Sequence, residues 1–589
     1  MSTHFLESTG EDAVPRDPLE YLKKHLEGNK AAVATTLASR LRKNPGDDGF
    51  VLSYVLSSWF PIIAASLGPI SNLNSVGALV DRWRMPIDGS ERPGDLHWVL
   101  GLNALSLFFG CAANISLFLN YAGKLNYSIA QYISILGWYC ASGLLMSLLI
   151  ATRWVYFGDG SPYVRSQGYW HAVITCILYG TSATMLFVNE IGHLQGRYGA
   201  SFNLTTHQRS LMVQNVVLLV WIAAGGAVFA KLNHITYADG VYYCVVTVLT
   251  IGLGDILPPD TLARALCLPF AFIGVIMLGL IVATIRSVVL EAGSEMLLFH
   301  RNEKMRNSVW EQLNMNYAPE TFRPSIAGGR GSSSFGTMRR IWDKSRSQAR
   351  LRSVLSTLTA FLIFLLLGAM VFYFSEPWSY FEAVYFCCLC LLTIGYGDFA
   401  PTSNASRPFF VVWSLGAVPL MTILISNLGD TLFSVILEGN NMLGDLFLGS
   451  PTKPPADASL SQSRPSLASR GECDIIADAV EEEWTNRPVG IDRAINLCHE
   501  IRTALDCLIS SPSSNYEFAE WAHMLHDTLP PDMVQSVREH PHFWVSDKSP
   551  LRYPIVEPQL FLERYLLALE FELQQLKNPT KTGQISIHG

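Results

Sequence analysis

The sequence predicts an all-α membrane protein that crosses the bilayer eight times and carries two shorter apolar helices that enter the bilayer without crossing it. Three observations support this fold class. Of the 589 residues, 49% are hydrophobic and only 15% are charged, whereas soluble chains carry about 25% charged residues. Eight stretches supply the roughly 20 apolar residues that a crossing helix needs. A pattern of 23 residues occurs twice, each time after one predicted span and before another.

The apolar stretches fall into two length classes. The predicted spans cover residues 50–70, 97–122, 128–152, 169–191, 211–231, 264–290, 353–374 and 407–432. Two further apolar segments, 237–249 and 380–392, have 13 residues each, which is too short to cross and fits a re-entrant helix. Asn103 and Asn114 fall on one side of the second span, and we expect both to hydrogen-bond to neighbouring helices.

Lysine and arginine gather before the first span and again in residues 301–352. Such residues mark the cytoplasmic side, and six predicted spans separate the two groups. Both termini are therefore expected in the cytoplasm and the loop 81–96 outside, with no removable secretory signal at the start of the chain. The expected parts are an N-terminal segment 1–49, a four-helix domain 50–192, two repeat units 193–290 and 353–434, a basic cytoplasmic linker 291–352 and a C-terminal tail 435–589.

Two features of the cytoplasmic segments carry expectations of their own. The glycine- and serine-rich run 328–334 is expected to be flexible. Residues 561–577 show apolar side chains at helical spacing. This last helix either packs on a partner or completes a small tail domain.

Composition also excludes several functional classes. The net charge of −7 and the lack of a long Lys/Arg block argue against a nucleic-acid partner. The tail contains no GxxxxGK, GxSxG or metal-spaced histidine pair, so neither an enzyme nor a bound cofactor is expected. Cys387, Cys388 and Cys390 lie together without a histidine, and we interpret them as small buried hydrophobic residues rather than metal ligands.

The repeated pattern carries the chemistry. Residues 236–258 and 379–401 align without gaps at an offset of 143, and 11 of the 23 positions are identical. Each copy places a short helix before a TIGxGD segment. A chain that alternates left-handed and ordinary dihedrals turns its consecutive carbonyls to one side, and glycine adopts left-handed dihedrals at little cost. Such a row of oxygens can replace the hydration shell of an ion.

The residues that we expect to form this ion path follow from the pattern. They are Thr250, Ile251, Gly252, Leu253 and Gly254 in the first copy, and Thr393, Ile394, Gly395, Tyr396 and Gly397 in the second. Each short helix directs its carbonyl end, which carries partial negative charge, at the path. Asp255 and Asp398 follow the two segments and are expected to attract cations at the outer mouth.

The segment Thr393–Asp398 resembles the TVGYG filter of potassium channels. Four spans followed by two such units resemble the fungal outward-rectifying potassium channels, the TOK family. His207-Gln208-Arg209, TIGLGD at 250–255 and TILISN at 422–427 carry this resemblance. It is strong over about 205–435, looser over the first four spans and absent in the tail.

The resemblance implies eight transmembrane helices with two re-entrant pore helix/selectivity-filter loops per chain and a dimeric pore of two identical chains. It also implies potassium ions as the permeant species, outward rectification, and an integral membrane protein in the lipid of the plasma membrane. Leu253 departs from the pattern, because it stands where the second copy has Tyr396. A tyrosine there can hydrogen-bond behind the filter and brace it, so we hypothesise a softer filter at Leu253.

Gating leaves several alternatives. Gly274, Gly279, Gly416 and Pro419 either bend the helices that follow the filter segments or allow close helix packing. The first four spans lack arginines or lysines at three-residue intervals, so a moving voltage sensor is not expected. Ion occupancy of the filter is one candidate gate, and the inner ends of the helices are another. The rival functions are a potassium transporter of the pore-loop superfamily, a less selective cation channel, and a receptor whose spans only anchor the tail.

Overall fold

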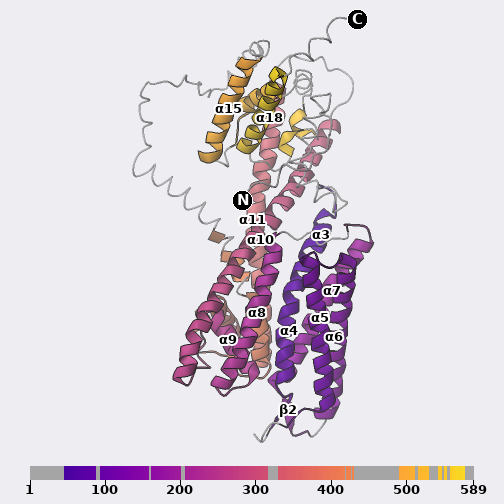
Figure 1. The fold of residues 1–589 in the computed structure, drawn as a ribbon, viewed down its shortest axis with the longest axis vertical. Helices are drawn as coiled ribbons and strands as arrows, with labels where there is room; N and C mark the ends of the chain where they lie inside the picture. Colours follow the sequence, from indigo (N-terminus) through magenta and orange to yellow (C-terminus); the bar gives the residue numbers. More distant parts are fainter. Residues whose placement is uncertain are drawn as a thin grey trace.

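The computed structural model describes residues 45–87, 93–157, 161–199, 206–315, 329–417, 420–425, 428–429, 490–510, 515–528, 542–546, 549–552 and 557–577. Figure 1 shows three parts within these ranges: a four-helix domain, a second bundle beside it that contains both short helices, and a tail module at the far end of two long helices.

The four-helix domain consists of two helix pairs joined by a small sheet. The first helix comprises α3 (Phe50–Tyr54), a π-helical turn (Val55–Trp59) and α4 (Phe60–Val80), and it packs on α7 (Gln167–Leu194). α5 (His97–Tyr121) packs on α6 (Tyr127–Tyr156). β1 (Arg84–Pro86) and β2 (Tyr163–Arg165) pair antiparallel and link α4 to α7 at the end away from the tail.

The first membrane helix extends to Val80, whereas the prediction ended it at residue 70. Its last turns contain polar side chains that find partners inside the bundle. The Asn74 amide nitrogen donates to the Ile70 carbonyl at 2.9 Å, and the Asn74 oxygen lies 2.9 Å from Nδ1 of His171. Satisfied polar groups are tolerated inside a membrane bundle, so apolar content alone ends this helix too early.

The two asparagines of the second span behave differently from each other. Asn103 donates to the Ala78 carbonyl of α4 at 2.9 Å, which confirms the expected bond to a neighbouring helix. Asn114 donates to the Gly110 carbonyl of its own helix at 3.0 Å, so the expectation is wrong for that residue.

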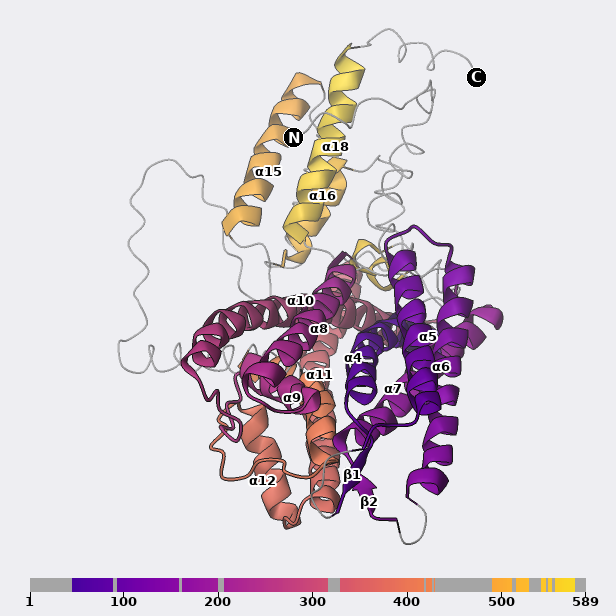
Figure 2. The same ribbon diagram turned by 60° about the horizontal axis from the view of Figure 1, so that its bottom comes forward.

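The second bundle contains the two repeat units. The first unit consists of α8 (Thr206–Leu232), the short α9 (Tyr237–Val248) and α10 (Thr261–Met315). The second consists of α11 (Gly329–Ser375), the short α12 (Tyr380–Leu391) and a helix over Ser406–Ile425. The described residues hold eight helices that are long and apolar enough to cross a membrane, which confirms the predicted number. Figure 2 shows α9 and α12 on the side of the bundle that also carries β1 and β2, away from the tail.

The linker is far more helical than expected. α10 and α11 continue well past their apolar segments. α11 begins at Gly329, so the expectation of a flexible run is wrong for 329–334. The reason is that Phe335, Met338 and Trp342 follow at helical spacing and are buried against the tail module. Sequence reasoning weighted the glycines and missed this apolar stripe.

The tail module consists of α15 (Ile491–Ser510), α16 (Phe518–Thr528), α18 (Glu557–Lys577) and two short 3-10 turns, Phe543–Val545 and Pro550–Arg552. α18 packs on α15 and α16, which confirms the alternative that the last helix completes a small domain. Trp521 and Trp544 occupy the centre of its core, together with Phe335 of α11.

A buried charge cluster fixes the tail to α10. Glu303 accepts hydrogen bonds from Arg306 at 2.9 and 3.1 Å and from Arg552 at 3.0 Å. Arg306 also donates to the Val545 carbonyl at 2.9 Å. Glu303 and Arg306 are 1% and 3% exposed. Buried charges persist only when paired and hydrogen-bonded in this way, so α10, which follows the first TIGxGD segment, and the tail module form one packed unit.

Candidate ion-conduction site

Both short helices begin with the same capping chemistry. The Thr236 side chain accepts a hydrogen bond from the Asp239 backbone, and the Ser379 side chain accepts one from the Glu382 backbone. The Glu382 side chain in turn accepts a hydrogen bond from the Ser379 backbone nitrogen, which completes a capping box. These caps define where α9 and α12 start, and hence where the TIGxGD segments that follow them lie.

The TIGxGD segments have the backbone that the sequence predicts. Gly252 and Gly254 have φ of 65° and 76°, and Gly395 and Gly397 have φ of 50° and 78°. Thr250 and Thr393 are left-handed as well, with φ of 57° and 54°. Sequence reasoning did not identify the two threonines, because a β-branched residue is rarely left-handed. Left-handed dihedrals therefore occur at every second residue of both segments.

The two segments lie against each other in one chain. A methyl group added to Gly395 would overlap the Ile251 carbonyl oxygen and lie 2.8 Å from the Ile251 carbonyl carbon. A methyl group added to Gly397 would likewise overlap the Leu253 carbonyl oxygen. The carbonyl oxygens of the first segment thus face the glycines of the second. By contrast, a methyl group added to Gly252 or Gly254 would meet nothing within 4 Å among the described residues.

The side chains behind the segments show the same asymmetry. Ile251 and Leu253 are 2% and 5% exposed, whereas Ile394 and Tyr396 are 43% and 71% exposed. One segment is thus covered by its own chain, and the back of the other is open. The brace that we expected from Tyr396 is not formed within the described part of the chain.

Another pair of tyrosines stands behind the segments. Tyr242 of α9 lies beside the Asp255 carboxylate, and Tyr385 of α12 lies beside the Asp398 carboxylate. The repeat aligns the two tyrosines, since 242 and 385 differ by 143. Comparing identical positions of the two copies could have identified them from sequence. Asp255 and Asp398 thus each have a tyrosine of the preceding short helix beside them, and their role at an outer mouth stays a prediction.

A buried carboxylate organises the loop after the second segment. Glu376 accepts bonds from the backbone nitrogens of Thr402 and Ser403 at 2.7 and 2.8 Å, and from the Ser406 hydroxyl at 2.5 Å. Burial disfavours the charged form of Glu376, but these hydrogen bonds outweigh burial and lower its pKa. The aligned position in the first unit is Asn233, so this anchor belongs to the second unit alone.

The four-helix domain reaches the first unit at the same end. Asp81, directly after α4, accepts from the Ala238 backbone at 2.8 Å, and Gln167 of α7 donates to Asp239 at 2.9 Å. Both contacts fall on the first turn of α9. Asn404 also donates to the Arg165 carbonyl of β2 at 3.1 Å.

The candidate gating residues separate into different environments. A methyl group added to Gly274 would lie 2.6 Å from Val248 of α9, which favours the close-packing interpretation at that position. A methyl group added to Gly279 would meet nothing within 4 Å in the described part of the chain, and one added to Gly416 would make ordinary contact with Phe364. Pro419 lies outside the described residues. Bending at Gly279 or Gly416 stays a prediction.

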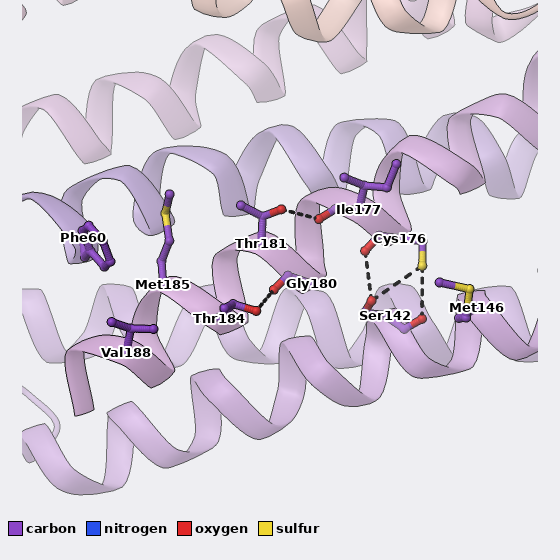
Figure 3. Close-up of a pocket in the computed structure, with 10 residues that line it drawn as sticks. All are labelled: Phe60, Ser142, Met146, Cys176, Ile177, Gly180, Thr181, Thr184, Met185 and Val188. Atoms are coloured by element: carbon purple, nitrogen blue, oxygen red, sulfur yellow. Dashed lines mark hydrogen bonds between the residues drawn. The ribbon is translucent and has the colours of Figure 1, made fainter. Parts of the chain in front are cut away.

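A groove in the four-helix domain lies apart from the TIGxGD segments. A groove of about 520 Å³ opens between α6 and α7 of the four-helix domain. Figure 3 shows that its polar side chains are turned to backbone carbonyls. Ser142 of α6 donates to the Cys176 carbonyl of α7 at 2.9 Å, and Thr181 and Thr184 donate at 2.8 and 2.7 Å to carbonyls one turn earlier in α7. The groove is therefore a packing feature of the helices, remote from the TIGxGD segments.

The cysteines of α12 pack as the sequence analysis expected. Cys387 and Cys390 are buried in the apolar core of the second bundle, and Cys388 packs against it. This environment confirms their interpretation as small hydrophobic residues.

Comparison with known proteins adds the family of the two units. Residues 216–291 and 360–434 each match the ion-channel domain family, described as "Ion channel". Two segments of the chain are therefore similar to this family. They coincide with the two units described above, and the eight spans make the protein an integral membrane protein of all-α type. The ion-channel family is not a family of enzymes, which agrees with the expectation for this chain.

Several curated proteins are similar over this region. Two-pore potassium channel 2 of Arabidopsis thaliana is 26% identical over 243 residues, which cover 40% of this chain and 49% of the relative. Two pore potassium channel a of Oryza sativa subsp. japonica is 23% identical over 220 residues, or 36% of this chain and 55% of the relative. Potassium channel subfamily K member 10 of Homo sapiens is 21% identical over 225 residues, or 36% and 35%. The chain spans about half the length, or less, of these relatives.

Proposed function

We propose that this protein is a potassium-selective channel in which two identical copies surround one pore. The observation that carries the proposal is the half-closed ring of carbonyls. One chain brings two TIGxGD segments together, with the oxygens of the first against the glycines of the second. The glycines of the first segment and the back of the second stay uncovered. A second copy related by a twofold axis would cover both, and four segments would then enclose the ion path.

Potassium is the proposed ion because both segments keep the threonine, glycine and aspartate positions of the filter type that selects it. The relatives are themselves named as potassium channels. Carbonyls of residues 250–253 and 393–396 would coordinate the ion, and Asp255 and Asp398 would raise its concentration at the outer mouth. Intact paired glycines in both copies argue against the pore-loop transporter alternative.

The orientation and finer identity belong to the same proposal. Arg306 of α10 and Arg339 of α11 bond to Val545 and Glu557 of the tail module, so the tail side is proposed to be cytoplasmic. Both termini are proposed to lie on that side as well. The plasma membrane, outward rectification and membership of the TOK family are proposed from the sequence resemblance.

Gating is proposed to depend on ion occupancy of the filter, because the first four spans offer no ladder of charges. The activation voltage should then shift with external potassium. An activation curve that does not move with external potassium would favour a gate at the inner helix ends. Leu253→Tyr is expected to brace the first segment and sharpen selectivity, and an unchanged potassium-to-sodium ratio would refute the idea of a softer filter.

The proposed function is tested by reconstituting the purified full chain in liposomes. The liposomes are expected to take up potassium but not sodium. The reversal potential should shift by about 59 mV for each tenfold change in the potassium gradient, which is the slope for one elementary charge. Equal passage of sodium would favour the less selective cation channel. Native mass spectrometry should give the mass of two chains, and a single chain that still conducts would refute the two-copy pore.

A further inference from the structure

One arginine joins the two units at the outer end of a single chain. Arg407 lies at the start of the helix Ser406–Ile425. Its Nη1 donates to Oδ1 of Asp239 at 2.6 Å, and its Nη2 lies 3.5 Å from Oδ2 of Asp255. Asp239 is in the first turn of α9, and Asp255 ends the first TIGxGD segment. An arginine of the second unit therefore holds both ends of the re-entrant segment of the first.

The internal repeat provides every part of this clasp a second time. At the offset of 143, Arg264 corresponds to Arg407, Glu382 to Asp239, and Asp398 to Asp255. Arg264 is also held in the same way as Arg407. Nε of Arg264 donates to the Pro258 carbonyl at 3.2 Å, and Nε of Arg407 donates to the aligned Pro401 carbonyl at 2.9 Å.

The second set of residues is not joined within one chain. Among the described residues, Arg264 has no carboxylate partner. Both Arg264 and Asp398 are exposed. Glu382 uses Oε2 to accept from the Ser379 backbone at 2.7 Å. Oδ2 of Asp239 likewise accepts a hydrogen bond at its own helix start, from the Thr236 hydroxyl at 2.8 Å, and Oδ1 of Asp239 accepts one from Arg407. Oε1 of Glu382 thus corresponds to Oδ1 of Asp239, the atom that accepts a hydrogen bond from Arg407.

We propose that Arg264 of one copy forms an ion pair with Glu382 and Asp398 of a second copy, and that two such clasps close the ring. This inference rests on the proposed two-copy pore. In a ring of four similar units, each arginine reaches the preceding unit in the same rotational sense. Arg407 makes that contact inside the chain, so Arg264 must make it across the interface. Gly252 and Gly254, which nothing covers among the described residues of one chain, would face that second copy.

Three arms test the clasp with the full chain in detergent or nanodiscs. In the first, Arg264→Cys is combined with Glu382→Cys and treated with a mild oxidant. We expect a covalent species of twice the chain mass. The matched control combines Leu262→Cys with Glu382→Cys, because Leu262 is exposed on the same helix two residues away. The cross-linked fraction should exceed that of the control about tenfold.

In the second arm, Arg264→Glu is expected to weaken dimerisation about tenfold or more, because it places like charges together at both interfaces. In the third arm, adding Glu382→Arg to Arg264→Glu is expected to restore most of the dimer. Restoration by the swapped pair separates an ion pair from a general loss of folding.

The outcomes distinguish the two levels of the argument. If the wild-type chain conducts as a single copy, the proposed two-copy pore is refuted and the clasp with it. If the wild-type chain is a dimer but the cysteine pair matches its control and the charge swap restores nothing, the clasp alone is overturned. Cross-linking above the control together with restoration supports the clasp.

Discussion

Replacing Gly252 by alanine tests the half-closed ring directly. In one chain this position has open space, whereas Gly395 is blocked by the Ile251 carbonyl. If a second copy covers the first segment, its Ile394 carbonyl would block Gly252 in the same manner. The two-copy pore therefore predicts that Gly252→Ala and Gly395→Ala have equally severe effects.

The magnitude can be worked from the backbone. Both glycines have left-handed φ, 65° at Gly252 and 50° at Gly395. Placing an L-residue there costs about 1–2 kcal/mol, which lowers the population of the conducting conformation about 5- to 30-fold. A methyl group that overlaps a carbonyl oxygen also displaces the backbone of the proposed filter. The displaced carbonyl oxygens would then no longer lie at the distance that coordinates the ion.

The assay is potassium flux into liposomes, normalised to the amount of folded protein. Both variants should lose flux beyond the 30-fold that strain alone explains. Gly143→Ala serves as the control, because Gly143 lies in α6 with open space around it and ordinary φ. A Gly252→Ala protein that keeps flux within the range set by strain, while Gly395→Ala is silent, would refute the reasoning that a second copy faces the first segment.

Three further predictions concern the parts around the filter. Hydrogen bonds lower the pKa of Glu376 in the folded protein, so the stability that this carboxylate contributes is fully present above its unfolded-state pKa near 4.5 and is lost as the pH falls through the lower folded-state pKa. Glu376→Gln should therefore lower the thermal midpoint at neutral pH and make that midpoint decline less steeply in acid. A variant whose midpoint declines in acid as steeply as that of the wild type would contradict this. Glu303→Gln leaves Arg306 buried without its carboxylate, so it should destabilise the contact between the tail module and α10 by about 3–5 kcal/mol. Proteolytic release of the tail should then be faster. Glu311 is exposed on the same helix, so Glu311→Gln should leave the rate of release unchanged. Gly274→Leu overpacks against Val248 and should cost about 1–3 kcal/mol, with lower current per folded channel; equal effects of Gly279→Leu, in open space, would contradict the packing interpretation.

The membrane part of the fold was predictable because its signals are local. Apolar length gives the eight helices, and the repeat gives both short helices within a residue or two of α9 and α12. The glycines of the TIGxGD segments could be assigned their left-handed dihedrals from residue type alone. Thr250 and Thr393 could not, because their conformation is imposed by the carbonyl row rather than by their side chains.

The contacts between distant segments were not predictable in this way. The Glu303 cluster joins residues 249 positions apart, and nothing local in either sequence announces the partner. The helical linker was missed for a related reason, since Gly329 and its neighbours have low intrinsic helix propensity and the tail module outweighs it. Arg407 lies beyond the aligned 23 residues, so its role became visible only when the folded units were compared.

The ties between α9 and the four-helix domain make the walls of the proposed pore mechanically unlike. Asp81 and Gln167 hold the first turn of α9, while the described contacts of the α12 first turn stay within its own unit. In a pore of two copies, the laterally anchored walls would stand diagonally opposite each other. A tilt of α4 or α7 would then narrow the proposed ion path more along one diagonal than along the other, turning a round aperture into an oval one.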